Sequence, residues 1–322
     1  MGPISLFKSL LSGPGPRTIP EGLILFSKGI CMGCADIIPG VSGGTMALIM
    51  GIYSQLLLAV SSINDAIKHA VKLDFAAAAA SLHLRFLICL LSGIGISIVG
   101  LAGLMHYLLA EQPVPTWALF FGLISGSILI IGRKITNWPG VGGIAFVAGS
   151  IGAFFLVGII PISTPETYSF IFFAGMIAIC AMILPGISGS FLLLIMGKYQ
   201  FITGAIKNPF AGDSFAILAV FGCGCLCGLL GFSKILSYLL SRYHNATMAL
   251  LTGLMLGSLR KIWPWKETIE SIVIRGKTHI LSTKNIIPPI IDGEFYLALT
   301  FTLIGLAFVL VLQKMTGGKL GE

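Results

Sequence analysis

The sequence predicts an all-α polytopic membrane protein that forms one transmembrane bundle over residues 1–322, and three observations support this prediction. Of the 322 residues, 56% are hydrophobic and only 10% are charged, and the mean hydropathy is +0.99. A soluble domain normally carries about a quarter charged residues. Long apolar segments recur along the chain, and two of them contain the same interrupted motif. We therefore expect lipid, rather than water, to surround most of the molecule.

Six apolar segments are about as long as a membrane-spanning helix, which needs roughly 20 residues. They lie near residues 84–110, 116–133, 141–161, 213–241, 245–262 and 294–313. We expect one full crossing at each of them.

Two further apolar stretches are longer than one span and contain Pro-Gly and Ser-Gly dipeptides. They lie near residues 21–60 and 168–206. Pro39-Gly40 and Pro185-Gly186 should each end one helix and let another begin, because proline removes a backbone donor and glycine adds flexibility. A broken helix is tolerated in a membrane only where it is buried in protein or lines a wet cavity. We therefore predict a re-entrant hairpin of two half-helices at each break, with two full crossings joined by a tight turn as the alternative.

The two interrupted stretches are copies of each other. CADIIPGVSGGTMALIMGIY at 34–53 aligns without gaps to CAMILPGISGSFLLLIMGKY at 180–199, and twelve of the twenty positions are identical. A second pattern, A-L-x-x-G-L-x-x-G-S, occurs at 118–127 and again at 249–258. We infer a duplication of the whole unit, with one repeat at about 21–161 and the other at 168–313.

The number of crossings predicts the orientation of the repeats. If each repeat is one re-entrant hairpin plus about three transmembrane helices, an odd number of crossings separates the copies, and the second copy must be inverted. This arrangement gathers most loop cations on one side: Lys8, Arg17, Lys68, Lys72, Arg85, Arg133, Lys134 and Arg242. The short connections on the other side carry Glu111 and Glu166. The basic side is therefore expected to be cytoplasmic and to hold both termini, and the net charge of +8 does not indicate nucleic-acid binding.

Broken helices in paired, inverted copies predict a transporter site near the bilayer midplane. Small hydroxyl and glycine residues follow each Pro-Gly, at the expected start of the second half-helix. They are Ser42, Gly43, Gly44 and Thr45 in one copy and Ser188, Gly189 and Ser190 in the other. Their backbone N–H groups are suited to an anion such as phosphate. The alternative is that the hydroxyl groups only cap the helices.

Three charged residues are candidates for transport roles. Asp36 is the one acidic residue in the core of an apolar stretch, and Met182 is its counterpart in the other copy. A carboxylate there usually marks an ion or proton pathway, a paired charge or a ligand, so we assign it to ion coupling, with a structural ion pair to Lys28 as the alternative. Lys28 and Arg85 are our candidates for contacting an anionic headgroup, although snorkelling is the ordinary explanation for cations at span ends.

No cofactor or metal is predicted. Cys31 and Cys34 have the C-x-x-C spacing, but no second Cys or His pair completes a zinc site. The glycines form no phosphate-binding loop, so we expect no ATP hydrolysis.

The paired motifs resemble those of a bacterial family of polyprenyl-phosphate transporters, long catalogued as a domain of unknown function. They are K-G-x-x-M-G-x-A-D-I-I-P-G-V-S-G-G-T at 28–45 and A-M-I-L-P-G-I-S-G-S at 181–190. The resemblance covers nearly the whole chain. It implies a flippase of the bacterial cytoplasmic (inner) membrane, not an enzyme, that returns undecaprenyl phosphate from the outer to the inner leaflet. This lipid carries the precursors of peptidoglycan and other envelope polymers.

The phosphate headgroup would then sit at the paired half-helix starts while the polyprenyl tail stays in lipid. Coupling to a proton or sodium gradient through Asp36 is a further hypothesis. A small-anion transporter or channel would use the same architecture. A membrane lipid phosphatase of the same pathway is the alternative from another class, but no His-containing phosphatase motif appears.

Overall fold

The computed structural model describes residues 13–37, 41–136, 138–159, 164–274, 277–288 and 291–315. Within these residues the chain is almost entirely helical, as predicted, apart from one antiparallel pair of strands that the sequence analysis did not foresee. The helices are α2 (Ile19–Ile37), α3 (Gly43–Ile49), α4 (Tyr53–Val71), α5 (Phe75–Ser81), α6 (Leu84–Glu111), α7 (Pro113–Lys134), α8 (Val141–Leu156), α9 (Tyr168–Ile183), α10 (Gly189–Ile195), α11 (Tyr199–Lys207), α12 (Ser214–Arg242), α13 (His244–Ile262) and α14 (Gly293–Met315), and the strands are β1 (Lys266–Ile274) and β2 (Lys277–Asn285).

Four helices of the described chain are long and apolar enough to cross a bilayer: α6, α7, α12 and α14. They coincide with four of the six predicted crossings. The other two predicted segments, α8 and α13, are helical but do not meet this standard. With 16 residues, α8 is only about 24 Å long, which is shorter than the roughly 30 Å hydrocarbon core. Full crossings at α8 and α13 remain predictions.

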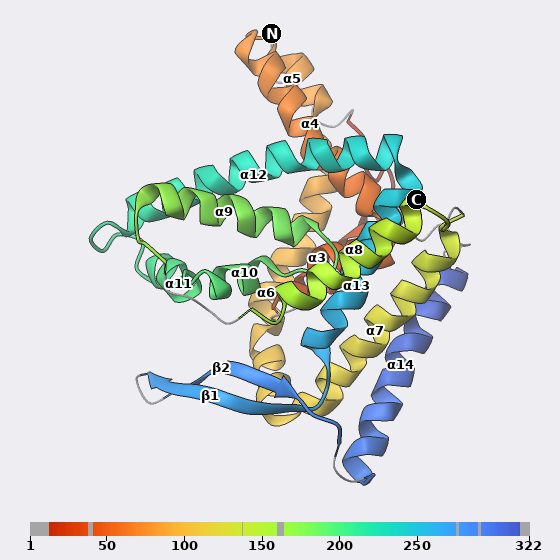
Figure 1. Cartoon of the computed structure of the whole chain (residues 1–322). Coiled ribbons are helices and arrows are strands. Elements are labelled where there is room, and N and C mark those ends of the chain that lie inside the picture. The colour runs from red at the N-terminus through yellow and green to blue at the C-terminus, as the bar shows by residue number, and fades with distance from the viewer. Residues whose placement is uncertain are drawn as a thin grey trace.

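Eight helices pack in four close pairs: α2 with α6, α9 with α12, α7 with α14, and α8 with α13. Figure 1 shows α7 and α14 running side by side at the right of the view. Two of the pairs, α7 with α14 and α8 with α13, join a helix from the first half of the chain to one from the second.

A reciprocal pair of glycines lies in each of these four interfaces. In the α7–α14 interface, a β-carbon at Gly122 would overlap the carbonyl oxygen of Thr302, and one at Gly305 would overlap that of Leu119. The other pairs are Gly29 and Gly93, Gly175 and Gly224, and Gly149 and Gly253. Close backbone approach through small residues is the usual packing mode of membrane helices, where no hydrophobic effect drives association.

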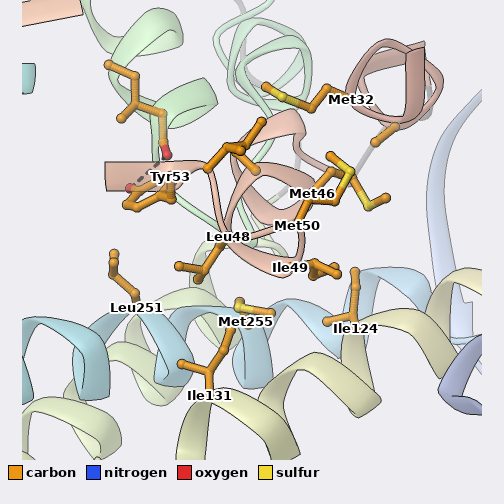
Figure 2. Packing of buried hydrophobic residues seen from close by; sticks show 14 of the residues in the cluster. Met32, Met46, Leu48, Ile49, Met50, Tyr53, Ile124, Ile131, Leu251 and Met255 are labelled. Carbon is orange, nitrogen blue, oxygen red and sulfur yellow. Dashed lines mark hydrogen bonds between the residues drawn. The ribbon is translucent and has the colours of Figure 1, made fainter. Parts of the chain in front are cut away.

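The short helix α3 lies at the centre of the core. All seven of its residues are buried, so it is enclosed on every side. Figure 2 shows Leu48 and Ile49 above Met255 of α13 and Ile124 of α7. A helix that is apolar on all sides can lie in a protein core or face lipid, and the burial of every residue of α3 places this one in the core.

Each interrupted stretch bends a second time, which corrects the prediction of two half-helices per stretch. Gly51 and Gly197 have φ angles of +67° and +63°. Glycine adopts this left-handed conformation at no steric cost, so α3 and α10 end there and a third helix follows in each stretch. The axes of α10 and α11 differ by 112°, which suggests a re-entrant loop. The M-G-x-Y pattern that recurs at 50–53 and 196–199 marks this second break in the sequence.

Candidate functional site: the junction of the two helix breaks

The residues that follow the first break are in direct contact with the residues that precede the second break. The Ser42 hydroxyl lies 3.1 Å from the carbonyl oxygen of Met182 and 3.2 Å from that of Leu184, where it can donate to either. The Tyr53 hydroxyl donates to the carbonyl oxygen of Ile183 at 3.0 Å, as the dashed line in Figure 2 shows. Side chains of the first stretch therefore satisfy carbonyl groups that the end of α9 leaves without helical partners.

The second stretch also donates a hydrogen bond to the first. The backbone N–H of Gly186 donates to Oγ1 of Thr45 at 2.8 Å. Gly186 has a φ of +88°, which favours glycine, and a β-carbon there would lie 2.9 Å from the Leu254 carbonyl oxygen of α13. At Gly44, a β-carbon would lie 2.6 Å from the carbonyl oxygen of Ile183. We call this region, residues 41–46 with 182–190, the break junction. Pro39 and Gly40 lie outside the described residues.

The start of α3 is already capped from within the chain. The N–H of Gly43 donates to Oδ1 of Asp36 at 2.8 Å, and the N–H of Gly44 donates to Oγ of Ser42 at 3.1 Å. These N–H groups are thus not bare, contrary to the expectation for this copy, and the capping alternative describes what the structure contains. The carboxylate of Asp36 occupies the position at which an anion would bind.

The start of α10 differs. Ser188 makes no capping bond with its side chain, and its hydroxyl lies 2.8 Å from that of Ser190. Within the described chain, neither hydroxyl makes another hydrogen bond. Met182 takes the place of Asp36, and its Cγ would lie 2.6 Å from a β-carbon at Gly189. The two copies therefore present unlike helix starts, one closed by a carboxylate and one without a charge.

The two candidate cations lie away from the junction. Nζ of Lys28 donates to the carbonyl oxygen of Met50, at the C-terminal end of α3, at 2.9 Å, so the ion pair with Asp36 does not form in the described structure. Lys28 lines a cavity of about 590 Å³. Other residues in its wall include Glu21, Gln55, His83 and Phe86.

Arg85 packs beside this cavity. Its guanidinium donates to the carbonyl oxygen of Gly13, and its β-carbon would lie 2.9 Å from one at Gly15, which lines the cavity. The Nε atom of Arg85 is buried and has no hydrogen-bond partner among the described residues. Both candidate cations are therefore features of the cavity rather than of the break junction.

Tyr53 contacts the break junction through Ile183, a role that the sequence did not predict although the same tyrosine recurs at position 199. The Tyr53 side chain is 1% exposed, whereas Tyr199 is 41% exposed. The repeat alone thus could not show which copy carries the contact.

We expect Tyr53→Phe to lower the free energy of unfolding by about 1–3 kcal/mol, because the buried carbonyl of Ile183 loses its donor. Thermal unfolding of the purified protein in detergent measures this loss. Tyr199→Phe is the matched control and should change stability by less than about 0.5 kcal/mol. Equal effects of the two substitutions would contradict the role given to the Tyr53 hydroxyl.

Comparisons with known proteins agree with the resemblance in the motifs. A family model described as undecaprenyl phosphate translocase-like matches residues 32–279. A polyprenyl-phosphate transporter of Vibrio cholerae serotype O1 is 43% identical over 300 residues, which cover 91% of this chain and 96% of the relative. A polyprenyl-phosphate transporter of Staphylococcus aureus is 35% identical over 259 residues, or 75% of this chain and 86% of the relative. No solved structure gives a significant match.

Proposed function

The chain belongs to the undecaprenyl phosphate translocase-like family, and from this premise we propose that it flips a polyprenyl phosphate from the outer to the inner leaflet of the bacterial cytoplasmic membrane. The headgroup passes the break junction while the polyprenyl tail stays in lipid. One observation supports this path above all: hydroxyl groups of one broken stretch contact the backbone of the other inside an apolar bundle.

The break junction is one of the polar regions in the buried interior, which also contains Lys198 and further hydroxyl side chains. Ser42 is 2% exposed, Thr45 is 0% exposed and Ser188 is 5% exposed. A phosphate leaving water needs hydrogen-bond donors to replace its hydration. Hydroxyl and backbone N–H groups at the two breaks would supply such donors once they exchange their partners within the chain for the phosphate.

We place the headgroup first at Ser188, Gly189 and Ser190. No carboxylate faces this helix start in the described structure, and the two hydroxyl groups bond only to each other. A phosphate there would accept from both hydroxyls. At Ser42, Gly43, Gly44 and Thr45 the headgroup would instead have to displace Asp36 from the N–H of Gly43.

Asp36 is therefore our candidate for ion coupling. Its negative charge lies where the headgroup must pass, so the two anions repel each other. Binding of a proton or a sodium ion to Asp36 removes this repulsion and lets the headgroup move on. Transport would then depend on the gradient that loads Asp36.

The cavity beside Lys28 and Arg85 is the proposed exit to the inner leaflet. It lies on the side of the loops that carry the basic residues, which we assign to the cytoplasm together with both termini. With about 590 Å³ it has room for a phosphate and the first part of a lipid tail. Lys28 and Arg85 would attract the phosphate by charge.

Inverted repeats over 21–161 and 168–313 give this path its two access routes. Equivalent contacts in both halves support the duplication. Gly253 has the same position in the second A-L-x-x-G-L-x-x-G-S pattern as Gly122 has in the first. Each of these glycines lies against the backbone of a neighbouring helix. If the halves are inverted, the two helix starts open toward opposite leaflets, and rocking of one against the other alternates the access.

The proposal is tested with liposomes that contain only the purified chain and a fluorescent undecaprenyl phosphate. We expect the label in the outer leaflet to become protected from a membrane-impermeant quencher, faster than in protein-free liposomes. Release of phosphate from a polyprenyl pyrophosphate would instead indicate a lipid phosphatase. Uptake of inorganic phosphate without lipid movement would indicate a small-anion transporter or channel.

A further inference from the structure

Two lysines, Lys261 and Lys266, lie where α13 ends and β1 begins. The ammonium of Lys261 is 4.6 Å from the ring centre of Phe191, and that of Lys266 is 3.7 Å from the ring centre of Trp117. These rings belong to α10 and α7, so the cluster forms only when three distant parts of the chain meet.

Neither ammonium has an anionic partner in the part of the chain that the structure describes. Within the described residues the ammonium groups of Lys261 and Lys266 make no hydrogen bond or ion pair, although both side chains are half-buried. Burial, with a further contribution from the charge of Lys261, lowers the pKa of Lys266 to about 7. Neighbouring cations that lose water without gaining an anion are costly, and cation–π contacts recover only part of that cost.

The start of β1 is held firmly in this position. The indole N–H of Trp263 donates to the carbonyl oxygen of Ile286 at 2.8 Å, and the ring of Trp265 stacks on Phe295 with centres 5.8 Å apart. This anchoring places Lys266 over Trp117. The start of the strand pair thus holds a cation against the helical bundle, and we assign this role to the polar segment 263–293.

Lys261 has no cationic counterpart in the first half of the chain. When the A-L-x-x-G-L-x-x-G-S alignment is continued, Lys261 corresponds to Ile130, which is 2% exposed and part of the hydrophobic core. The packing of the repeat therefore does not require a cation at this position. The position is also near the break junction, because Phe191 directly follows Ser190.

We propose that Lys261 and Lys266 together bind a phosphomonoester dianion, and that on the proposed function this is the headgroup of the lipid before it enters the break junction. A phosphate between the two ammonium groups supplies the missing counter-charge and charge-assisted hydrogen bonds. In the proposed orientation this end of α13 faces the outer leaflet, opposite the cavity beside Lys28. The chain then holds one cationic site at each end of the path.

The test measures thermal unfolding of the full chain in nanodiscs of zwitterionic lipid. Inorganic phosphate and undecaprenyl phosphate are titrated separately, with sodium chloride at equal ionic strength as the reference. We expect both to stabilise the wild type. Lys261→Gln and Lys266→Gln should each raise the apparent Kd for both ligands by about tenfold or more. Lys207→Gln, at an exposed lysine of α11, is the matched control and should leave it unchanged.

Lys266→Met separates binding from packing. If the cluster is an empty anion site, this substitution removes an uncompensated cation, so the ligand-free protein should melt at a higher temperature and no longer respond to phosphate. A lower melting temperature with an intact phosphate response would overturn the proposal and make Lys266 a packing residue. Lys266→Arg should keep the response.

The two ligands separate the sources of the phosphate. A response to undecaprenyl phosphate, with or without one to inorganic phosphate, supports the lipid headgroup as the ligand, whereas a response to inorganic phosphate alone overturns it. If the wild type binds phosphate in this way but does not move lipid in liposomes, the proposed function fails and the anion site stands. If it moves lipid and the lysine variants bind as the wild type does, only the site fails.

Discussion

Asp36→Asn is expected to reduce the gradient-dependent part of polyprenyl phosphate transport by about 100-fold while leaving the protein inserted and folded. The asparagine side chain is nearly the same size, and its oxygen can still accept from the N–H of Gly43, so the start of α3 stays capped. What is lost is the exchangeable charge that we assign to ion coupling. Protection of fluorescent undecaprenyl phosphate in liposomes, with imposed pH or sodium gradients, measures the effect.

Asp65→Asn is the control for this substitution. Asp65 is an exposed residue of α4, paired with Lys68 at 2.7 Å, and its replacement should leave transport unchanged. Transport by Asp36→Asn at the wild-type rate over a range of pH and sodium concentrations would remove Asp36 from the mechanism.

Gly44→Ala is expected to disrupt the break junction and to reduce transport severely. The added β-carbon would lie 2.6 Å from the carbonyl oxygen of Ile183 and 2.9 Å from that of Met182. Both obstacles are backbone atoms, so the two breaks must move apart, which loosens the contact of Ser42 with the end of α9. Overpacking of this kind costs about 1–3 kcal/mol of stability.

Gly204→Ala in α11 is the matched substitution, because a β-carbon at that position meets no atom within 4 Å. It should be neutral or slightly stabilising, since alanine favours a helix more than glycine does. Thermal unfolding and lipid transport, measured on both variants, make the comparison. If both behave as the wild type does, the close approach of the breaks is not required.

Much of the helical architecture follows from patterns within single segments. Apolar length located α6, α7, α12 and α14, and the Pro-Gly dipeptides located the end of α9. The length of α8 could not be judged in the same way, because its apolar segment continues beyond Leu156, where the helix ends. The strand pair was missed because its strands mix polar and apolar residues and lie between two long apolar runs.

The site was harder to predict, because its contacts join distant residues. The repeated motif singled out Ser42 and Thr45 but could not show that they reach across to Met182 and Gly186. Similarly, the sequence showed that Asp36 is unusual, but only the fold shows that it caps Gly43.

The surroundings of Lys261 likewise could not be predicted from the sequence. Its position at the end of an apolar segment indicates an ordinary interfacial anchor. Only the packing of α13 against its neighbours brings it over Phe191 and near Lys266. A cluster that depends on three separate elements leaves no local pattern in the sequence.

Photolabelling tests most directly whether the headgroup passes the break junction. A polyprenyl phosphate with a photoreactive group beside its phosphate is irradiated with the reconstituted protein, and the labelled peptides are identified by mass spectrometry. We predict labels within residues 41–46 and 182–190, and competition by unlabelled undecaprenyl phosphate. Labels confined to the lipid-facing surface of α12, with none in either segment of the junction, would contradict the account.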